Sequence, residues 1–231
     1  MTVSAERGAD PSERTGRTEA TRQAILQAAC EVIAEAGLES VRMRMIADRA
    51  AVSTALLHYH FANRETLFLA ALKYSYANAG AQDYGDEPPT RHPHAWQLAK
   101  AVELCLPVTT ELRRDFLLWQ ELSLRASRDA DSAAAAAELY TDLADWIAEI
   151  VRAGIAAGEF RPVTTAPEAA AVQAAHLVIA LTQGYGSALL LDGAVLDQEA
   201  ARDAIWTTLS LSLGLPAERP ALNGLPRPTA R

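Results

Sequence analysis

The chain has 231 residues, of which half are hydrophobic, and a formal net charge of −8 at pH 7. This length and composition suffice for a substantial core in one large domain or two small ones. The sequence contains no uncharged apolar stretch of about 18 residues, and its polar N-terminus lacks the apolar segment of a secretory signal, so we expect neither a membrane span nor export. Cys30 and Cys105 lack metal-ligand spacing, which favours two free thiols in a cytoplasmic protein.

The acidic excess is confined to one part of the chain. Residues 1–80 hold 9 Lys and Arg against 9 Asp and Glu, whereas residues 81–231 hold 12 against 20. Attraction to phosphate falls off over about 10 Å at moderate salt, so a neutral N-terminal region with clustered arginines can still bind nucleic acid. We expect no strong non-specific binding from this region.

Residues 1–17 are charged and contain Gly, Pro and Ser, which predicts a disordered arm. Thr18 is a suitable N-cap for a helix over residues 18–36, whose apolar residues recur every three or four positions until Gly37 ends it. Three apolar-periodic stretches follow in close succession and predict helices over residues 43–50, 54–60 and 63–76. Ser53 and Asn63 are the expected N-caps of the second and third of these helices.

The break between the first two short helices, residues 51–53, has the length of a helix-turn-helix turn. Spacing alone does not distinguish a helix-turn-helix from an ordinary corner between two helices. The outward face of the second helix, however, is uncharged and carries Thr54, His58 and Tyr59, whose side chains hydrogen-bond to bases and phosphates. This choice of residues favours a helix-turn-helix that binds DNA.

The stretch RMRMIADRAAVSTALLHYHFANRETLFLAAL carries a specific resemblance. Residues 18–72 resemble the DNA-binding domain of the tetracycline-repressor (TetR) family of bacterial transcriptional regulators, most specifically in the LLHYHF run and the Asn-Arg-Glu-x-Leu run after it. The family usually has Gly where this chain has Ala51. If the backbone has φ > 0 there, Ala costs about 1 kcal/mol without preventing the fold.

The expected DNA contacts combine position on the two helices with this resemblance. Arg42 and Arg44 can reach phosphate or guanine, and Ala55 and Leu56 offer only methyl contact, as to thymine. Tyr59 and His60 match family positions that hydrogen-bond phosphate. The full predicted set is Arg42, Arg44, Ser53, Thr54, Ala55, Leu56, His58, Tyr59, His60 and Arg64. For each of them, the alternative is a solvated surface side chain.

A loop rich in proline and glycine is predicted over residues 79–94. Helical periodicity then resumes without the alternation of strands, and predicts helices over residues 95–106, 110–127, 129–157, 165–191 and 197–213. The expected fold is therefore all-α, with about nine helices in the order of the same family. We expect a disordered arm (1–17), a helix-turn-helix domain (18–62), a helical ligand-binding and dimerisation domain (63–215) and a loose tail (216–231).

Aromatic side chains with a few polar groups inside a helical bundle suit a small, largely apolar effector. The predicted ligand-binding residues are Trp96, Phe116, Trp119, Tyr140, Trp146, His176 and Gln183. Core packing is the alternative for each aromatic. His176 and Gln183 share a helix face, and as buried polar groups they would pair with either a ligand or a neighbouring helix. The WQELSLRA stretch is similar to the family branch that contains the choline-responsive regulator of betaine synthesis.

Gly184 and Gly186 would let a second helix approach closely, and we expect them to form a homodimer interface with Ile205, Leu209 and Leu213. A dimer also fits DNA recognition, because a helix-turn-helix protein usually reads two half-sites of a pseudo-palindromic operator.

Enzymatic motifs are not found: the sequence has no Gly-rich phosphate loop, nucleophile elbow or His-x-x-x-His pair. His58 and His60 lie about 200° apart on a helix and cannot share a metal. We therefore expect no catalytic site, metal site or cofactor. The leading hypothesis is a ligand-responsive repressor that releases its operator when a small molecule binds. The alternative is a helical small-molecule-binding or scaffold protein with a vestigial DNA-binding head, which Ala51 and the neutral charge of the head would favour.

Overall fold

The structure, a computed structural model, describes residues 11–79, 91–163, 166–191 and 196–222, and all of its regular elements in these ranges are helical. The chain divides into two compact units, Met1–Ser75 and Tyr76–Arg231. The division falls inside the fourth helix, later than the expected boundary at residue 63. Across the described ranges nine α-helices occur, which confirms the predicted all-α fold.

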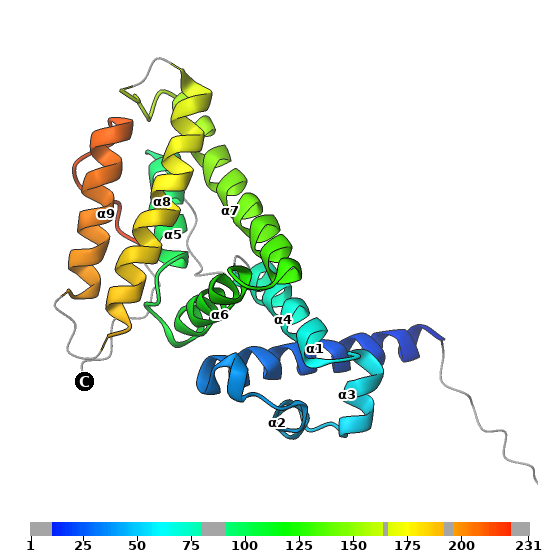
Figure 1. Cartoon of the computed structure of the whole chain (residues 1–231). Helices are drawn as coiled ribbons and strands as arrows, with labels where there is room; N and C mark the ends of the chain where they lie inside the picture. Colours follow the sequence, from blue (N-terminus) through cyan, green and yellow to red (C-terminus); the bar gives the residue numbers. More distant parts are fainter. Residues whose placement is uncertain (1–10, 80–90, 164–165, 192–195, 223–231) are drawn as a thin grey trace, which may run out of the picture. The chain divides into compact units, whose positions relative to one another are not determined.

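The N-terminal unit contains α1 (Pro11–Ala36), the short 3-10 helix η1 (Leu38–Ser40), α2 (Met43–Arg49), α3 (Thr54–His60) and the first part of α4 (Arg64–Ala79) (Figure 1). The expected start of the first helix at Thr18 was wrong, because residues 11–17, predicted as part of the arm, are helical. Pro11 suits the first turn of a helix, where its missing N–H would have no partner. The rest of the predicted arm, residues 1–10, lies outside the described residues.

One small core joins the elements of the N-terminal unit. Its large, fully buried side chains come from every element: Ile25, Ile33, Leu38, Ile46, Leu57, Leu67 and Phe68. The Cys30 thiol of α1 donates a hydrogen bond to the carbonyl of Ala71 in α4, 3.3 Å away. Because α3 contributes only Leu57 to this core, the remaining surface of α3 is left available.

The C-terminal unit contains α5 (Pro93–Leu104), α6 (Thr110–Ala126), α7 (Ala130–Ala156), α8 (Pro167–Leu189) and α9 (Gln198–Leu213). In Figure 1, α8 lies between α7 and α9, and α5 packs against α7 and α9. The five predicted body helices are thus confirmed. Thr109 and Asp129 cap α6 and α7, accepting hydrogen bonds from the N–H groups of Leu112 (3.1 Å) and Ser132 (2.8 Å).

A buried ion pair lies in the core of this unit. Glu103 of α5 and Arg202 of α9 have side chains only 2% and 7% exposed, and the guanidinium donates to both carboxylate oxygens, with Nε 2.7 Å from Oε2. Burial acts to lower the pKa of Arg202, but its hydrogen bonds to Glu103 prevail and raise the pKa above the usual value. The ion pair joins α5 to α9.

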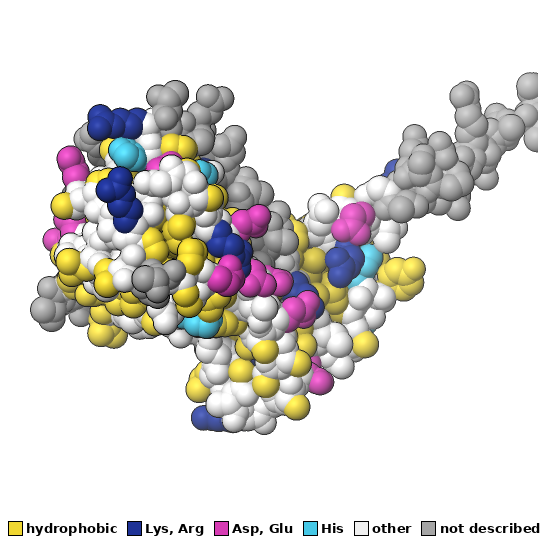
Figure 2. Space-filling view, turned by 90° about the horizontal axis from the view of Figure 1, so that it is seen from above, with side chains coloured by type: hydrophobic (Ala, Val, Ile, Leu, Met, Phe, Trp, Pro, Cys, Tyr) yellow, Lys and Arg dark blue, Asp and Glu magenta, His cyan; other side chains and the backbone are white. Residues whose placement is uncertain are grey.

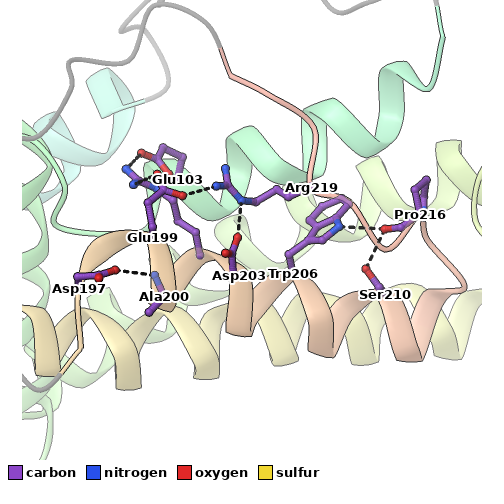
Figure 3. Close-up of polar contacts among 10 residues, drawn as sticks. Glu103, Asp197, Glu199, Ala200, Asp203, Trp206, Ser210, Pro216 and Arg219 are labelled. Atoms are coloured by element: carbon purple, nitrogen blue, oxygen red, sulfur yellow. Dashed lines mark hydrogen bonds and ion pairs between the residues drawn. The ribbon is translucent and has the colours of Figure 1, made fainter.

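The chain after α9 returns along that helix. The indole N–H of Trp206 donates to the carbonyl of Pro216 (3.0 Å), and Arg219 donates to Glu199 (2.7 Å), as Figure 3 shows. The prediction of a loose tail from residue 216 was therefore wrong for residues 216–222, because their carbonyl and guanidinium groups are tied to α9. Residues 223–231 lie outside the described residues. In the described ranges, no helix combines the length and the apolar character needed to cross a membrane.

Candidate nucleic-acid interface

In the turn between α2 and α3, Ala51 has the left-handed backbone geometry that the usual glycine of the family at this position indicated. Ala51 has φ +54°, and the N–H of Val52 donates to the carbonyl of Ala47 (3.0 Å), closing α2. Ser53 then caps α3 as predicted, its hydroxyl accepting from the N–H of Leu56 (3.1 Å). An L-residue with a side chain is disfavoured at this φ, so Ala51 holds a strained position in an otherwise well-capped turn.

Replacing Ala51 by glycine is expected to stabilise the N-terminal unit by about 1 kcal/mol, because glycine adopts φ > 0 without a Cβ clash. Urea unfolding of the full chain, followed by circular dichroism, measures this change. Ala62→Gly is a suitable control: Ala62 is exposed outside the helices and its φ is not positive. A decrease in stability for Ala51→Gly would contradict the strain at this residue.

The outer surface of α3 gathers most of the predicted DNA contacts. Leu57 is fully buried, whereas Thr54, Ala55, Leu56 and His58 are exposed and Tyr59 is 79% exposed. His60 is half-buried, with its ring edge-to-face with that of Tyr59 at 5.3 Å between centroids. Five uncharged or imidazole side chains therefore share one exposed surface of a short helix, while His60 lies at the edge of that surface.

The arginines predicted to contact DNA differ in their exposure and in their hydrogen-bond and ion-pair partners within the unit. Arg42 and Arg44 are exposed at the start of α2, and the nearest acid to Arg44 is Asp48 at 3.7 Å. Arg64 is half-buried and donates to the carbonyl of Leu38 (3.4 Å), which lies in η1. Arg64 thus has a structural role inside the unit, whereas Arg42 and Arg44 are available for phosphate.

Arg49 positions α2, and we did not predict this role from the sequence. Its guanidinium donates to Glu35 (2.7 Å) and Glu31 (3.2 Å) of α1. The hydrogen bond from Arg49 is the main cause of a lowered pKa for Glu35, and the two carboxylates raise the pKa of Arg49. Four-residue spacing of Glu31 and Glu35 on one helix face was the signal available in the sequence.

The Glu35→Gln variant is expected to be less stable than the wild type at about pH 7, and the difference is expected to shrink at about pH 2. The folded-state pKa of Glu35 lies below its usual 4.5, so its stabilising contribution is present above the unfolded-state pKa and is lost as pH falls through the folded one. Urea unfolding at both pH values tests this. Glu39→Gln is the control, because Glu39 is exposed and has no ion pair with any residue that the structure describes. A difference that persists undiminished at low pH would contradict the ion pair as its cause.

Charges of both signs are interspersed on the surface. On the face in Figure 2, acidic and basic side chains alternate with hydrophobic ones, and the coloured residues there form no continuous basic patch. Because residues 1–80 hold equal numbers of basic (Lys and Arg) and acidic residues, DNA binding by this chain would depend on specific contacts more than on bulk charge.

The predicted effector residues differ in how deeply they are buried. Trp96 and Phe116 are each 6% exposed, and Phe116 packs against Gly186 of α8. Trp146 is 40% exposed and His176 is exposed, so the expectation that these two line an interior ligand site was wrong. Both lie on outward faces of their helices. The rings of His176 and Tyr140 are 5.9 Å apart.

The other two members of the set, Trp119 and Gln183, are half-buried. The argument that Gln183, as a buried amide, must pair with either a ligand or a neighbouring helix therefore does not hold, since an amide near solvent can be hydrated. No group of three or more His, Cys, Asp or Glu in the described ranges has the arrangement of a metal site.

The expected dimer-interface set was also partly wrong. Ile205, Leu209 and Leu213 are at most 1% exposed and belong to the core of their own unit. Gly186 is buried against Phe116, so it allows close packing within the chain. Only Gly184 is exposed, with no atom within 4 Å of the position that a Cβ would occupy.

The N-terminal unit contains a helix-turn-helix whose second helix is exposed, and the chain continues into a separate helical unit. These two features define the class of two-unit, all-α helix-turn-helix proteins. A sequence model described as "Bacterial regulatory proteins, tetR family" matches residues 25–71, within the N-terminal unit. The N-terminal unit is therefore similar to the DNA-binding domain of the TetR family.

Three relatives extend this result. The HTH-type transcriptional repressor KstR of Rhodococcus jostii is 31% identical over 115 residues, so the match covers 50% of this chain and about half (51%) of that relative. A TetR-family transcriptional regulator from Rhodococcus sp. superposes with a TM-score of 0.69 at 26% identity, covering 84% of this chain and 98% of its own. A transcriptional regulator from Saccharomonospora viridis, in complex with choline, gives 0.66 at 23% identity, covering 85% and 98%. At 23% identity, the similarity to the Saccharomonospora viridis protein shows the fold alone.

Proposed function

We propose that this chain is a homodimeric, ligand-responsive repressor of transcription that binds a pseudo-palindromic DNA operator in the bacterial cytoplasm. The observation that carries the proposal is the exposed face of α3, which follows a helix-turn-helix turn in a TetR-family domain and contains no Lys, Arg, Asp or Glu. A surface helix that serves only solubility has no reason to lack charge there. We propose repression, and not activation, of transcription because the relative KstR is a transcriptional repressor.

In the proposed complex α3 lies in the major groove. Thr54 and His58 are exposed on one side of α3 and would face bases, whereas Tyr59 and His60 would hydrogen-bond phosphates. The two exposed arginines at the start of α2 would add phosphate contacts. Ser53 would act indirectly, because its hydroxyl is already used to cap α3.

The dimer would form through the outward faces of α8 and α9. The exposed residues of α8 along one ridge are small or uncharged: Ala169, Val172, His176, Ala180 and Gly184. On α9, Thr207 is exposed and Leu211 is 75% exposed. Two such faces from two copies suit a four-helix interface, and a two-fold dimer presents two α3 helices to two half-sites.

The Leu211→Asp variant is expected to shift the protein from dimer to monomer, because the dimer would bury a carboxylate without a partner. Light scattering after size-exclusion chromatography measures the mass, and the operator affinity should fall with it. The matched control is Leu124→Asp, at a leucine of α6 that is 56% exposed. A dimer that survives Leu211→Asp unchanged would exclude this interface.

The effector is proposed to be a small molecule that binds the C-terminal unit. A ligand can release the operator only if it binds the DNA-free conformation more tightly than the DNA-bound one. Thermal shift of the full chain against a metabolite panel identifies candidates. Choline belongs in the panel because of the similarity of the WQELSLRA stretch and the choline complex of the Saccharomonospora viridis protein.

The deciding experiment for DNA binding is a mobility shift with the full chain and a duplex from upstream of its own gene. We expect specific binding by the wild type and at least about a 100-fold loss for the Thr54→Ala/Tyr59→Ala/His60→Ala variant, since each contact contributes about 1–3 kcal/mol. Tyr59→Phe keeps the ring and removes only the hydroxyl, so it should lose the phosphate hydrogen bond alone and weaken binding by less than the triple variant. Circular dichroism verifies that each variant is folded.

The second candidate function, a helical binding or scaffold protein with a vestigial head, is favoured by one observation, the strained Ala51. It predicts that the wild type and the triple variant show the same absence of binding at every salt concentration. That result would refute the repressor proposal.

A further inference from the structure

The recognition helix α3 lacks every side chain that makes a two-pronged hydrogen bond to a base. Its sequence, TALLHYH, contains no Arg or Lys, which read guanine in this way, and no Asn or Gln, which read adenine. His58 can offer a single hydrogen bond to N7, an acceptor that adenine and guanine share. Hydrogen bonds from α3 therefore discriminate poorly between the purines.

The geometry of α3 places apolar side chains at positions where polar side chains that hydrogen-bond to bases normally lie. Leu57 is the buried residue, and at about 100° per residue Ala55 and Tyr59 point almost directly away from it. Leu56 flanks them and is 39% exposed. The first turn of α3 thus presents a methyl group and an isobutyl group to the surroundings, with the Thr54 hydroxyl beside them.

We infer that α3 reads thymine, by contact of Ala55 and Leu56 with thymine C5-methyl groups in the major groove. The inference rests on the proposed function. The C5-methyl is the only apolar group that a base pair shows in this groove, so exposed apolar side chains can be satisfied there by thymine alone among the four bases. The half-site facing α3 is accordingly rich in A·T pairs, with the thymines at the positions nearest Ala55 and Leu56.

The absence of Lys and Arg from α3 supports the same conclusion. Arg42 and Arg44 are exposed at the start of α2, where they would bind the flanking phosphates. With little electrostatic attraction to rely on, specificity depends on burying apolar surface against methyl groups, and each methyl contributes a modest, additive share.

The test begins with selection of the preferred duplex from a randomised library by the full-length protein. Each thymine of the selected half-site is then replaced in turn by deoxyuridine, which removes only the C5-methyl. We expect thymine-rich half-sites, and about a fourfold weaker Kd for each contacted methyl removed. In the Leu56→Ala variant the penalty should disappear at one thymine and persist at the other.

Arg44→Ala is the matched control. It should weaken binding to thymine and deoxyuridine duplexes by the same factor and reduce the salt dependence, as loss of a phosphate contact does. Specific binding with equal affinity for thymine and deoxyuridine at every position, or guanine-dominated half-sites opposite α3, would overturn the inference and leave the proposed function standing. Failure of the wild type to select any sequence would overturn both.

Discussion

Replacing Glu103 by leucine is expected to destabilise the C-terminal unit by about 3–5 kcal/mol, because the change leaves the guanidinium of Arg202 charged in the core without its main partner. The side chain of Arg202 is only 7% exposed, so water cannot replace the carboxylate. Its remaining bond to Glu199 (2.9 Å) involves a carboxylate that is 64% exposed and compensates little.

The double variant Glu103→Leu/Arg202→Met should recover most of this loss, since apolar side chains of similar size often replace a buried ion pair without net cost. Urea unfolding by circular dichroism, at equal protein concentrations, gives the free energies of unfolding for the wild type and both variants. If the double variant is as unstable as the single one, the charge of Arg202 is not the cause, and lost packing is.

Replacing Gly214 by alanine is expected to cost about 2–4 kcal/mol, the sum of backbone strain and overpacking. Gly214 ends α9 with φ +62°, and a Cβ there would lie 2.6 Å from the carbonyl oxygen of Arg161. That oxygen belongs to the backbone of Arg161. The position of this backbone is fixed by the hydrogen bond that the N–H of Arg161 donates to the carbonyl of Leu213 (2.7 Å).

Gly158→Ala separates the two contributions. Gly158 also has a positive φ, +74°, but no atom lies within 4 Å of its Cβ position. Its replacement should cost only the strain, about 1 kcal/mol. Thermal unfolding of the two variants in parallel measures the difference, and equal losses of stability would show that the carbonyl of Arg161 moves aside without cost.

Local features of the fold were predictable from the sequence because they depend on neighbouring residues. Ser53, Thr109 and Asp129 cap their helices by bonds to the residue three positions on, and such bonds follow from the order of residues alone. The left-handed turn at Ala51 was likewise indicated by a family position that usually holds glycine.

Features that depend on distant residues were not predictable in this way. Glu103 and Arg202 are 99 residues apart, and nothing local marks either as buried. Helical spacing also placed Trp146 and His176 among candidate interior residues, although both face outward. Spacing identifies which residues share a face, but which face is covered depends on how the helices of the bundle pack around one another.

The four tryptophans, Trp96, Trp119, Trp146 and Trp206, all belong to the C-terminal unit. Intrinsic indole emission therefore reports on that unit alone, and tyrosine is the brightest natural fluorophore of the N-terminal unit. Trp206, 2% exposed and bonded to Pro216, is shielded from collisional quenchers, whereas Trp146 at 40% is open to them. Thermal unfolding of the C-terminal unit can thus be followed by tryptophan fluorescence, to which the N-terminal unit does not contribute.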